Sequence, residues 1–383
     1  LPIRDVVSWN ALISGYAQHG QGHRALDCLE QMQRGDISPD EFTFTCILKA
    51  CGSIRSLEEG QRIHGMIMDR AFLIKNHMVG NALVDMYAKC GAFEKAGQVL
   101  EDLHVQTVVA WNALIAGYIL AGKGHEALNS FARMQREGLS PDDVTFTCIL
   151  TACGSIGAIN EGEESENMIV NRGLLGKNIC LGNALINMYS KCGVLVKAHK
   201  VLEGLPVRNV VSWNTLIEGY AEHEQGHDAL NCYVQMQKEG ISPNEVTFTC
   251  MLKACGSIGA INKGREIHDQ IIDEGLLGKT IVLGNALVDM YAKCGALAKA
   301  KQVLEELPVR DTISWSTLIA GYAQEGQGYE ALNCFMEMQR EGFSPDEVSF
   351  VCLLSACAHS GILDEAQRYY EIMNRRYGII PRL

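Results

Sequence analysis

The sequence of 383 residues lacks any apolar run of the roughly 18 residues that a membrane helix needs, since its longest runs resemble VSFVCLLSACA from Val348. No membrane span is therefore predicted. Aromatic residues are few, at 7%, and positive charge is not in excess, because the formal net charge is −12. This charge excludes a protein that holds nucleic acid by bulk electrostatic attraction. Disorder is also excluded, because 47% hydrophobic residues suffice for a continuous core.

Motifs for metal binding or catalysis are missing as well. Fifteen cysteines occur, but no CxxC pair suggests zinc. His19 with His23 has the spacing of helical metal ligands, as does His223 with His227, but glycine or glutamine turn residues lie between the partners, and Ala121 stands at the place equivalent to His19. No nucleophile, base and orienting group converge outside the repeat pattern. We therefore predict no metal, no cofactor, no catalytic residue and no small-molecule substrate.

What is present is a repeat. The stretch VVSWNALISGY at Val6 returns as VVAWNALIAGY at Val108, VVSWNTLIEGY at Val210 and TISWSTLIAGY at Thr312, each 102 residues after the last. The four tryptophans share this spacing. All cysteines except Cys180 also share it, and they form four series. Cysteines at equivalent places are predicted to be free, buried packing residues in a reducing compartment.

Each 102-residue unit divides into three helix-turn-helix patterns of 35, 36 and 31 residues. In the first, one helix has an apolar stripe at helical spacing, made of Trp9, Leu12, Ile13 and Tyr16. The glycines of HGQG end this helix, and the second helix is predicted to bury Leu26, Leu29 and Met32. One such pair cannot hide its apolar stripe alone, so neighbouring pairs stack. The predicted fold is all-α, a right-handed α-solenoid superhelix.

The short segments that connect the helix-turn-helix patterns also have recurring sequences. SPDE from Ser38 to Glu41 predicts a capping box with Ser38 as N-cap and Pro39 at the first helical position. LPIRD at the start matches LPVRN and LPVRD later in the chain, so we expect residues 1–5 to end a preceding repeat of a longer protein. Eleven repeats are predicted to follow, at residues 6–40, 41–76, 77–107, 108–142, 143–178, 179–209, 210–244, 245–280, 281–311, 312–346 and 347–383.

A second stripe on the first helix, Val7, Asn10 and Ser14, is predicted to face outward. Asparagine is a poor helix former, so helix propensity does not explain its recurrence at this place. Two explanations stay open. The amide bonds to a neighbouring repeat or caps a loop, or it faces a nucleobase edge, which needs a short hydrogen-bonding side chain.

The helical pairs of 35, 36 and 31 residues, with VVSWNALI, LKACGS, GNALVDMYAKCG and SPDE, resemble the pentatricopeptide repeats (PPR) of the plant PLS subclass. In that family each repeat addresses one nucleotide of single-stranded RNA, 5′ to 3′ along the chain, through its fifth and last residues, while second residues of adjacent repeats clamp the base. The resemblance implies clamping by Val7, Val109, Val211 and Ile313. It implies base reading by Asn10, Asp40, Asn81, Asn112, Asp142, Asn183, Asn209, Asn214, Asn244, Asn285, Asp311, Ser316 and Asp346.

The pairs of fifth and last residues imply a target sequence. The resemblance assigns uracil to Asn10–Asp40, Asn112–Asp142 and Asn285–Asp311. It assigns pyrimidines to Asn183–Asn209 and to Asn214–Asn244, the latter leaning to cytosine, and guanine to Ser316–Asp346. The 36-residue repeats and the pair Asn81–Thr107 are left unread. The predicted footprint is 5′-UnnUnYYnUGn-3′.

Five lysines recur near the reading stripe, and they are candidate phosphate contacts or else solvated lysines placed favourably for the helix dipole: Lys49, Lys89, Lys191, Lys253 and Lys293. The resemblance implies the recognition array of an RNA editing or processing factor of the mitochondrion or chloroplast, with editing-complex proteins as further partners. The HxE and CxxC motifs of the family's deaminase extension do not occur in this chain, so we expect no enzyme activity. The alternative is a protein-interaction solenoid of the tetratricopeptide type, which the acidic charge and the apolar middle repeats favour.

Overall fold

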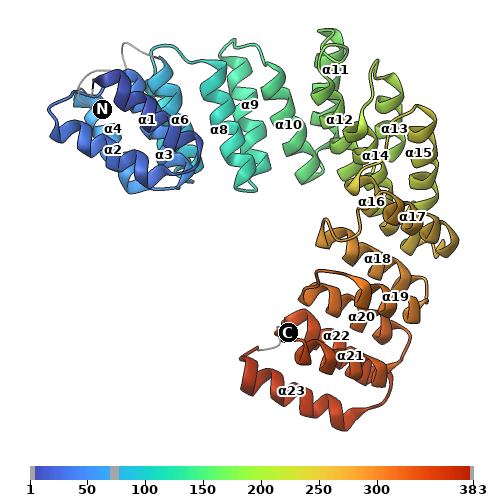
Figure 1. The fold of residues 1–383 in the computed structure, drawn as a ribbon. Coiled ribbons are helices and arrows are strands. Elements are labelled where there is room, and N and C mark those ends of the chain that lie inside the picture. Colours follow the sequence, from blue (N-terminus) through green and yellow to red (C-terminus); the bar gives the residue numbers. More distant parts are fainter. Residues whose placement is uncertain (1–4, 70–76, 380–383) are drawn as a thin grey trace. The chain divides into compact units, whose positions relative to one another are not determined.

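The structure, a computed structural model, describes residues 5–69 and 77–379 (Figure 1). These residues form 22 helices and contain no strand. The chain divides into two compact units, Leu1–Val207 and Arg208–Leu383. Helices come in antiparallel pairs, and we call the first member of each pair the A helix and the second the B helix.

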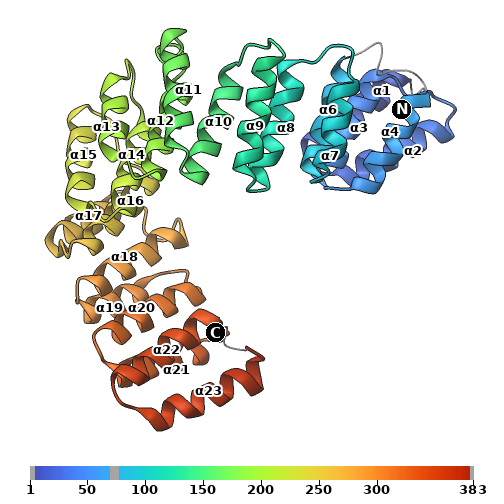
Figure 2. The ribbon, with the colours of Figure 1, turned by 180° about the vertical axis from the view of Figure 1, so that it is seen from behind.

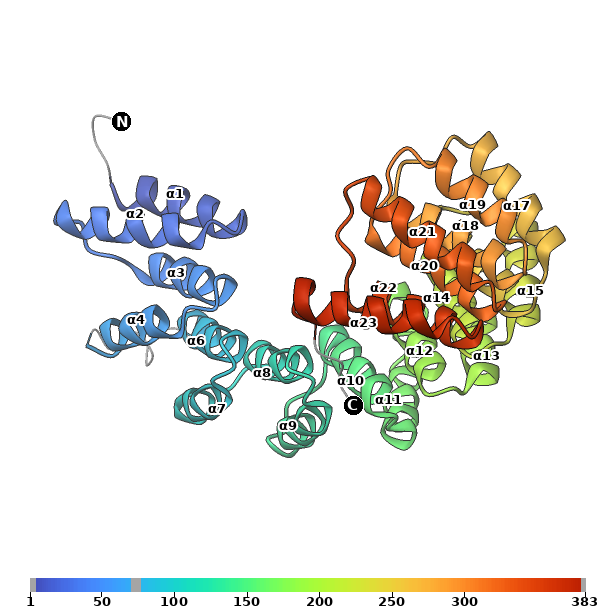
Figure 3. The same cartoon turned by 90° about the horizontal axis from the view of Figure 1, so that it is seen from below.

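In the first unit the A helices contact one another in chain order. They are α1 (Val6–Gln18), α3 (Glu41–Ser53), α6 (His77–Lys89), α8 (Val108–Leu120), α10 (Asp143–Ile156) and α12 (Ile179–Lys191). The B helices are α2 (Gly22–Arg34), α4 (Leu57–Asp69), α7 (Phe93–Asp102), α9 (Gly124–Arg136), α11 (Ile159–Asn171) and α13 (Leu195–Gly204). Figure 3 shows the two layers, with α6, α8 and α10 in one row and α7, α9 and α11 in the other.

The second unit has the same construction. Its A helices are α14 (Val210–Glu222), α16 (Glu245–Ser257), α18 (Ile281–Lys293), α20 (Thr312–Gln324) and α22 (Glu347–His359). Its B helices are α15 (Gly226–Lys238), α17 (Ile261–Asp273), α19 (Leu297–Glu306), α21 (Gly328–Arg340) and α23 (Leu363–Tyr377). Figure 2 shows α18, α20 and α22 following one another along this unit. The all-α solenoid predicted from the 102-residue period is confirmed.

The apolar stripes predicted for the first helical pair are largely correct. Trp9 and Ile13 of α1 are buried, and so are Leu26, Leu29 and Met32 of α2. Leu12 and Tyr16 are exceptions, since Leu12 is 45% exposed whereas its equivalent Leu114 is buried, and Tyr16 is half-buried. Helix α8 packs on α6, which precedes it, whereas within the described residues no helix precedes α1.

The capping box predicted at the SPDE joint is placed wrongly. Helix α3 begins at Glu41, its N-cap is Asp40 rather than Ser38, and the reciprocal partner is Thr43 rather than Glu41. Asp40 has extended backbone and accepts the Thr43 N–H, while the Thr43 hydroxyl accepts the Asp40 N–H. Aspartate caps a helix as well as serine does, and a hydroxyl three residues later completes the box. The same box recurs before α10, α14, α16, α20 and α22.

The cysteines behave as packing residues. All fifteen are free thiols, and most are buried or half-buried, with Cys180 exposed. Burial raises the pKa of Cys153, and likewise that of Cys255, to about 12. Such thiols are protonated and unreactive at neutral pH. Their regular spacing therefore reflects equivalent places in the core.

Candidate nucleic-acid interface

Apolar side chains stand exposed at the second residue of the A helices. The exposed fraction is 73% for Val7, 60% for Val109, 51% for Val211 and 60% for Ile313. The outward orientation predicted for Val7 is thus correct. An aliphatic side chain at one exposed place is ordinary, but its recurrence makes these residues candidates for a binding surface.

The sequence analysis singled out this place only in the 35-residue repeats, although every A helix has it. The missed second residues are exposed too: Phe42, Met78, Val144, Val246, Val282 and Val348, together with Cys180. The signal that could have found them is position alone, because each is the second residue of a predicted 31- or 36-residue repeat. The exposed second residues therefore form one row in each unit.

The asparagines of the predicted reading stripe are not exposed, and this part of the prediction is wrong. Asn10, Asn112 and Asn214 are 6–7% exposed, and Ser316 is 5% exposed. Asn81, Asn183 and Asn285 are half-buried. The physical reason is that the amides of Asn10, Asn112 and Asn214 bond to the cap of the following A helix, which covers them from the side.

The geometry is clearest at Asn112. Its amide Nδ2 donates to Asp142 Oδ1 at 2.9 Å, and its Oδ1 accepts the Thr145 hydroxyl at 2.7 Å. Asp142 Oδ1 also accepts the Thr145 N–H at 2.8 Å. The fifth residue, the last residue and the third residue of the next A helix thus form one polar cluster. Of the two explanations left open for the asparagine, bonding to a neighbouring repeat is therefore correct, and it leaves base contact possible only at the edge of this cluster.

The same cluster recurs at four other joints. It consists of Asn10, Asp40 and Thr43, of Asn214, Asn244 and Thr247, of Asn285, Asp311 and Ser314, and of Ser316, Asp346 and Ser349. In the last of these the fifth residue is a serine, whose hydroxyl lies 2.7 Å from the Ser349 hydroxyl.

Two of the predicted reading pairs differ. The Thr107 hydroxyl donates directly to Asn81 Oδ1 at 2.8 Å, and the next A helix has Ala110, without a hydroxyl, as its third residue. Asn183 lies in the first unit and Asn209 in the second, where Asn209 caps α14 by accepting the Ser212 N–H.

The middle repeats lack the cluster. The fifth residues Thr45, Thr147 and Thr249 donate their hydroxyls to the main-chain carbonyl four residues earlier in the same helix. The third residues of the following A helices are apolar: Val79, Leu181 and Leu283. Among the described residues, the middle repeats 143–178 and 245–280 thus show no polar pair of the kind found at Asn112, and the last residue of repeat 41–76 lies outside the described residues.

Two of the cap carboxyls have a pKa below the usual value for aspartate. Desolvation by partial burial works to raise the pKa of Asp142, but hydrogen bonds from Thr145 and Asn112 outweigh it and hold that pKa below its usual value. The balance is the same at Asp40, where hydrogen bonds from Thr43 and Asn10 lower the pKa. Both side chains are therefore carboxylates at neutral pH and act only as hydrogen-bond acceptors.

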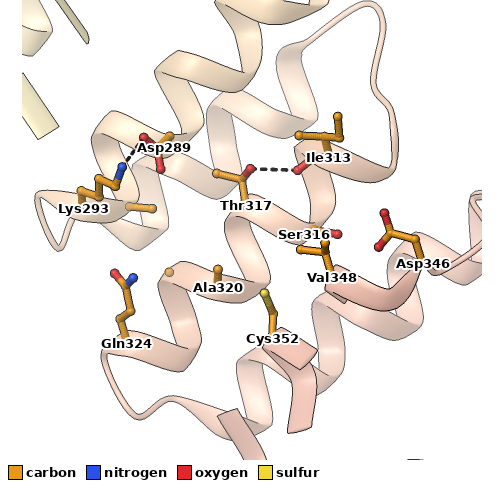
Figure 4. Close-up of a pocket in the computed structure, with 12 residues that line it drawn as sticks. Asp289, Lys293, Ile313, Ser316, Thr317, Ala320, Gln324, Asp346, Val348 and Cys352 are labelled. Carbon is orange, nitrogen blue, oxygen red and sulfur yellow. Dashed lines mark hydrogen bonds and ion pairs between the residues drawn. The ribbon is translucent and has the colours of Figure 1, made fainter. Parts of the chain in front are cut away.

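Two of the polar clusters border pockets with aliphatic walls. In the first unit, Met78, Val109 and Val144 surround Asn81 and Asn112 in a pocket of about 380 Å³. In the second unit, Ile313 and Val348 line a pocket of about 320 Å³ together with Ser316 and Asp346 (Figure 4). Each pocket thus combines exposed second residues with a largely buried polar group.

The predicted phosphate contacts stand near these pockets but differ in their pairing. Lys49 lines the first pocket and Lys293 the second. Lys89 forms an ion pair with Asp85 at 2.7 Å, and Lys293 forms one with Asp289 at 2.8 Å (Figure 4). Lys253 lies 3.9 Å from Glu222. At Lys191 the residue four places earlier is Asn187, so this lysine lacks the aspartate of its equivalents.

Other kinds of site find no support in the described part of the chain. No three His, Cys, Asp or Glu side chains there lie close enough to share a metal ion. None of the helices in residues 5–69 and 77–379 combines the length and apolarity needed to cross a bilayer.

Fold and site together define an α-solenoid of helical pairs that presents small, aliphatic-walled pockets along its A helices. Models of the PPR repeat family match residues 4–53, 106–155, 208–257 and 310–359, and a PPR repeat model matches residues 81–106, 183–210, 246–276, 285–311 and 348–377. The chain belongs to the PPR repeat family.

Curated relatives from Arabidopsis thaliana agree. A putative pentatricopeptide repeat-containing protein is 34% identical over all of this chain and 56% of its own length. One named as mitochondrial is 35% identical over 98% of this chain and 43% of its own length, and one named as chloroplastic is 34% identical over 99% and 44%. The chain thus spans about half the length of the curated relatives it matches.

A solved structure has the same fold. The pentatricopeptide repeat protein PPR10, in complex with an 18-nucleotide psaJ RNA element, matches with a TM-score of 0.68 over 96% of this chain and 60% of its own. Its sequence identity of 16% means that the likeness concerns the fold alone.

Proposed function

We propose that this chain binds single-stranded RNA, with the repeats placed along successive nucleotides. The observation that carries the proposal is the recurring pocket, in which exposed aliphatic second residues flank a buried fifth residue, Asn112 in one pocket and Ser316 in the other. Aliphatic walls can hold the two faces of a base, and the polar pair can meet its Watson–Crick edge. PPR10, which shares the fold, has been solved with RNA bound.

The chemistry of the pairs supports the proposed base preferences. At Asn112 the amide oxygen is taken by Thr145, so the pair offers one amide N–H as donor and the Asp142 carboxylate as acceptor. Uracil presents a carbonyl beside an N–H and matches this pair. At Asn214 the partner is Asn244, whose Oδ1 is occupied by Thr247 and by Asn214 itself, leaving donors. Cytosine, with two adjacent acceptors, matches better there.

The proposed footprint is 5′-UnnUnYYnUGn-3′, read by the repeats that begin at residues 6 to 347. Support for these repeat boundaries is that A helices begin at the first residue of each range. The alternation of 35, 36 and 31 residues supports the PLS subclass. The Arabidopsis relatives named as mitochondrial and chloroplastic support an organellar location. The role proposed there is RNA editing or processing, with editing proteins as partners and without catalysis by this chain.

The test is a binding titration with an RNA of this sequence and a control in which nucleotides 1, 4, 9 and 10 are exchanged. We expect the control to bind at least about thirtyfold more weakly, because four lost contacts of modest worth accumulate. The variant Asp142→Asn provides a matched check, since it copies the pair Asn214–Asn244. It should move the preference at nucleotide 4 from uracil toward cytosine.

Equal binding of both RNAs, or binding of neither, would refute the proposal and favour the protein-interaction solenoid. The net charge of −12 is the observation that favours that alternative. The same titration therefore also tests the alternative of a tetratricopeptide-like interaction solenoid.

A further inference from the structure

A buried hydroxyl lies behind five of the polar pairs. It belongs to the third residue of the next A helix: Thr43, Thr145, Thr247, Ser314 and Ser349, each 0% exposed. As part of a capping box, such a hydroxyl needs only its reciprocal bond with the N-cap residue. The bond that four of these hydroxyls make to the asparagine of the previous repeat goes beyond capping.

The hydroxyl has one proton, and the distances indicate where it goes. Thr145 accepts the Asp142 N–H at 3.1 Å, and its oxygen lies 2.7 Å from Asn112 Oδ1 but 2.8 Å from Asp142 Oδ1. At Thr247 the two distances are 2.6 Å to the amide and 3.0 Å to the cap. At Ser314 they are 2.5 Å and 2.9 Å. The shorter contact is with the amide oxygen each time.

The asparagine amide is therefore held in one orientation. If the Asn112 amide turned over, its oxygen would lie 2.9 Å from the Asp142 carboxylate oxygen, and two acceptors would face each other. The turned amide would also lose the hydrogen bond that the Thr145 hydroxyl donates, so a buried amide would be left with weaker hydrogen bonds. Only the observed orientation places the amide N–H beside the carboxylate, as a donor next to an acceptor.

We infer that the third-residue hydroxyl is a positioning residue for base recognition, which fixes the asparagine as a donor toward the nucleotide. This inference rests on the RNA binding proposed above. It adds a third position to the fifth and last residues of each repeat, one that contacts no base and acts through the amide.

The chain contains its own comparison. Behind Asn81 and Thr107 the third residue is Ala110, so the Thr107 hydroxyl bonds the amide oxygen instead. At Asn285 and Asp311 the equivalent residue is Ser314, which occupies a fully buried place without disturbing the helix. Ala110 is buried to the same extent. Replacing Ala110 by serine therefore copies an arrangement that the chain already has at Ser314.

The first experiment removes the hydroxyl at Thr145. Binding is measured with RNAs that carry uracil or cytosine at nucleotide 4, and with a second pair that differs at nucleotide 1 as an internal control. For Thr145→Val we expect the uracil-to-cytosine affinity ratio at nucleotide 4 to fall about tenfold, the worth of one hydrogen bond. The ratio at nucleotide 1 should not change, and Thr145→Ser should keep the wild-type ratio at both.

A purely structural role for Thr145 predicts a different result. Loss of the cap would weaken binding of all four RNAs by a similar factor and lower the thermal midpoint, while leaving the ratio at nucleotide 4 intact. That result would overturn the inference. If instead the wild-type protein does not discriminate between the RNAs at all, the proposed function fails, and the inference fails with it.

The second experiment adds the hydroxyl. Thr107→Asp alone supplies the last residue of a uracil pair behind Asn81, and Thr107→Asp with Ala110→Ser also supplies the positioning hydroxyl. We expect the double variant to prefer uracil over cytosine at nucleotide 3 about tenfold more strongly than the single variant does. Equal preference in the two variants, both folded by circular dichroism, would contradict the inference.

Discussion

At the scale of single residues, the cap residues serve two purposes at once. Asp142 begins α10 by accepting the Thr145 N–H, and it also accepts the Asn112 amide. Helix capping and the orientation of the Asn112 amide thus depend on the same carboxylate. A change at this residue affects both stability and the edge offered to a ligand.

The lowered pKa of Asp40 and of Asp142 predicts acid sensitivity. The folded state holds these carboxyls deprotonated at a pH where the unfolded chain already binds protons, so their stabilisation is complete above about pH 4 and is lost as pH falls through the lowered pKa. We expect urea denaturation to show falling stability from pH 5 to pH 2.5.

The double variant Asp40→Asn with Asp142→Asn tests this dependence, because asparagine caps α16 in the same way at Asn244. It should be less sensitive to acid by about 0.5–1 kcal/mol per site, the lower part of the range for a cap since both carboxyls are partly exposed. An unchanged pH profile would show that other carboxyls cause the acid loss.

At the scale of helices, close packing of neighbouring A helices depends on small residues. A Cβ added at Gly117 of α8 would lie 2.6 Å from Ala88 Cβ and 3.2 Å from the Ala88 backbone of α6. Backbone cannot yield as the end of a flexible side chain can. Gly15 occupies the equivalent place in α1, and among the described residues no other heavy atom lies within 4 Å of such a Cβ.

The two glycines therefore predict opposite effects of alanine. Gly117→Ala should destabilise the first unit by about 1–3 kcal/mol through overpacking. Gly15→Ala should stabilise α1 by up to about 1 kcal/mol, the difference in helix propensity. Chemical denaturation of both variants would measure this contrast, and destabilisation of equal size at both positions would contradict the packing argument.

At the scale of the whole molecule, charge sets the manner of binding. A net charge of −12 gives no general attraction to RNA, so electrostatic contributions must come from individual lysines. Lys89 and Lys293 are partly neutralised by Asp85 and Asp289, and would have to exchange those partners for phosphate. Lys191, with Asn187 in place of aspartate, needs no such exchange.

This difference predicts the salt dependence of RNA binding. Lys191→Ala should reduce the slope of log affinity against log salt by about 0.7, the value for one phosphate contact on a single strand. Lys89→Ala should change the slope less, and titrations between 50 and 200 mM salt would compare the two. Equal effects would mean that the ion pair does not limit contact with phosphate.

Repetition determined much of this protein from sequence alone. The 102-residue period predicts the solenoid, because equivalent residues at fixed spacing must occupy equivalent places. Helical periodicity identified Trp9, Ile13 and Leu29 as core residues. Position in the repeat also predicted that Val7 and Val109 face outward. These features depend on local pattern and on stacking of like on like, which a single sequence displays.

Tertiary structure decided the placement of the polar residues. Asn112 was expected at the surface, but it is buried because Asp142 and Thr145 reach it from the start of the next A helix, about thirty residues along the chain. The N-cap is Asp40 rather than the predicted Ser38, because the Asp40 carboxylate bonds both Thr43 and Asn10. Whether a short polar side chain faces solvent or a partner depends on contacts between helices distant in sequence, and periodicity does not encode those contacts.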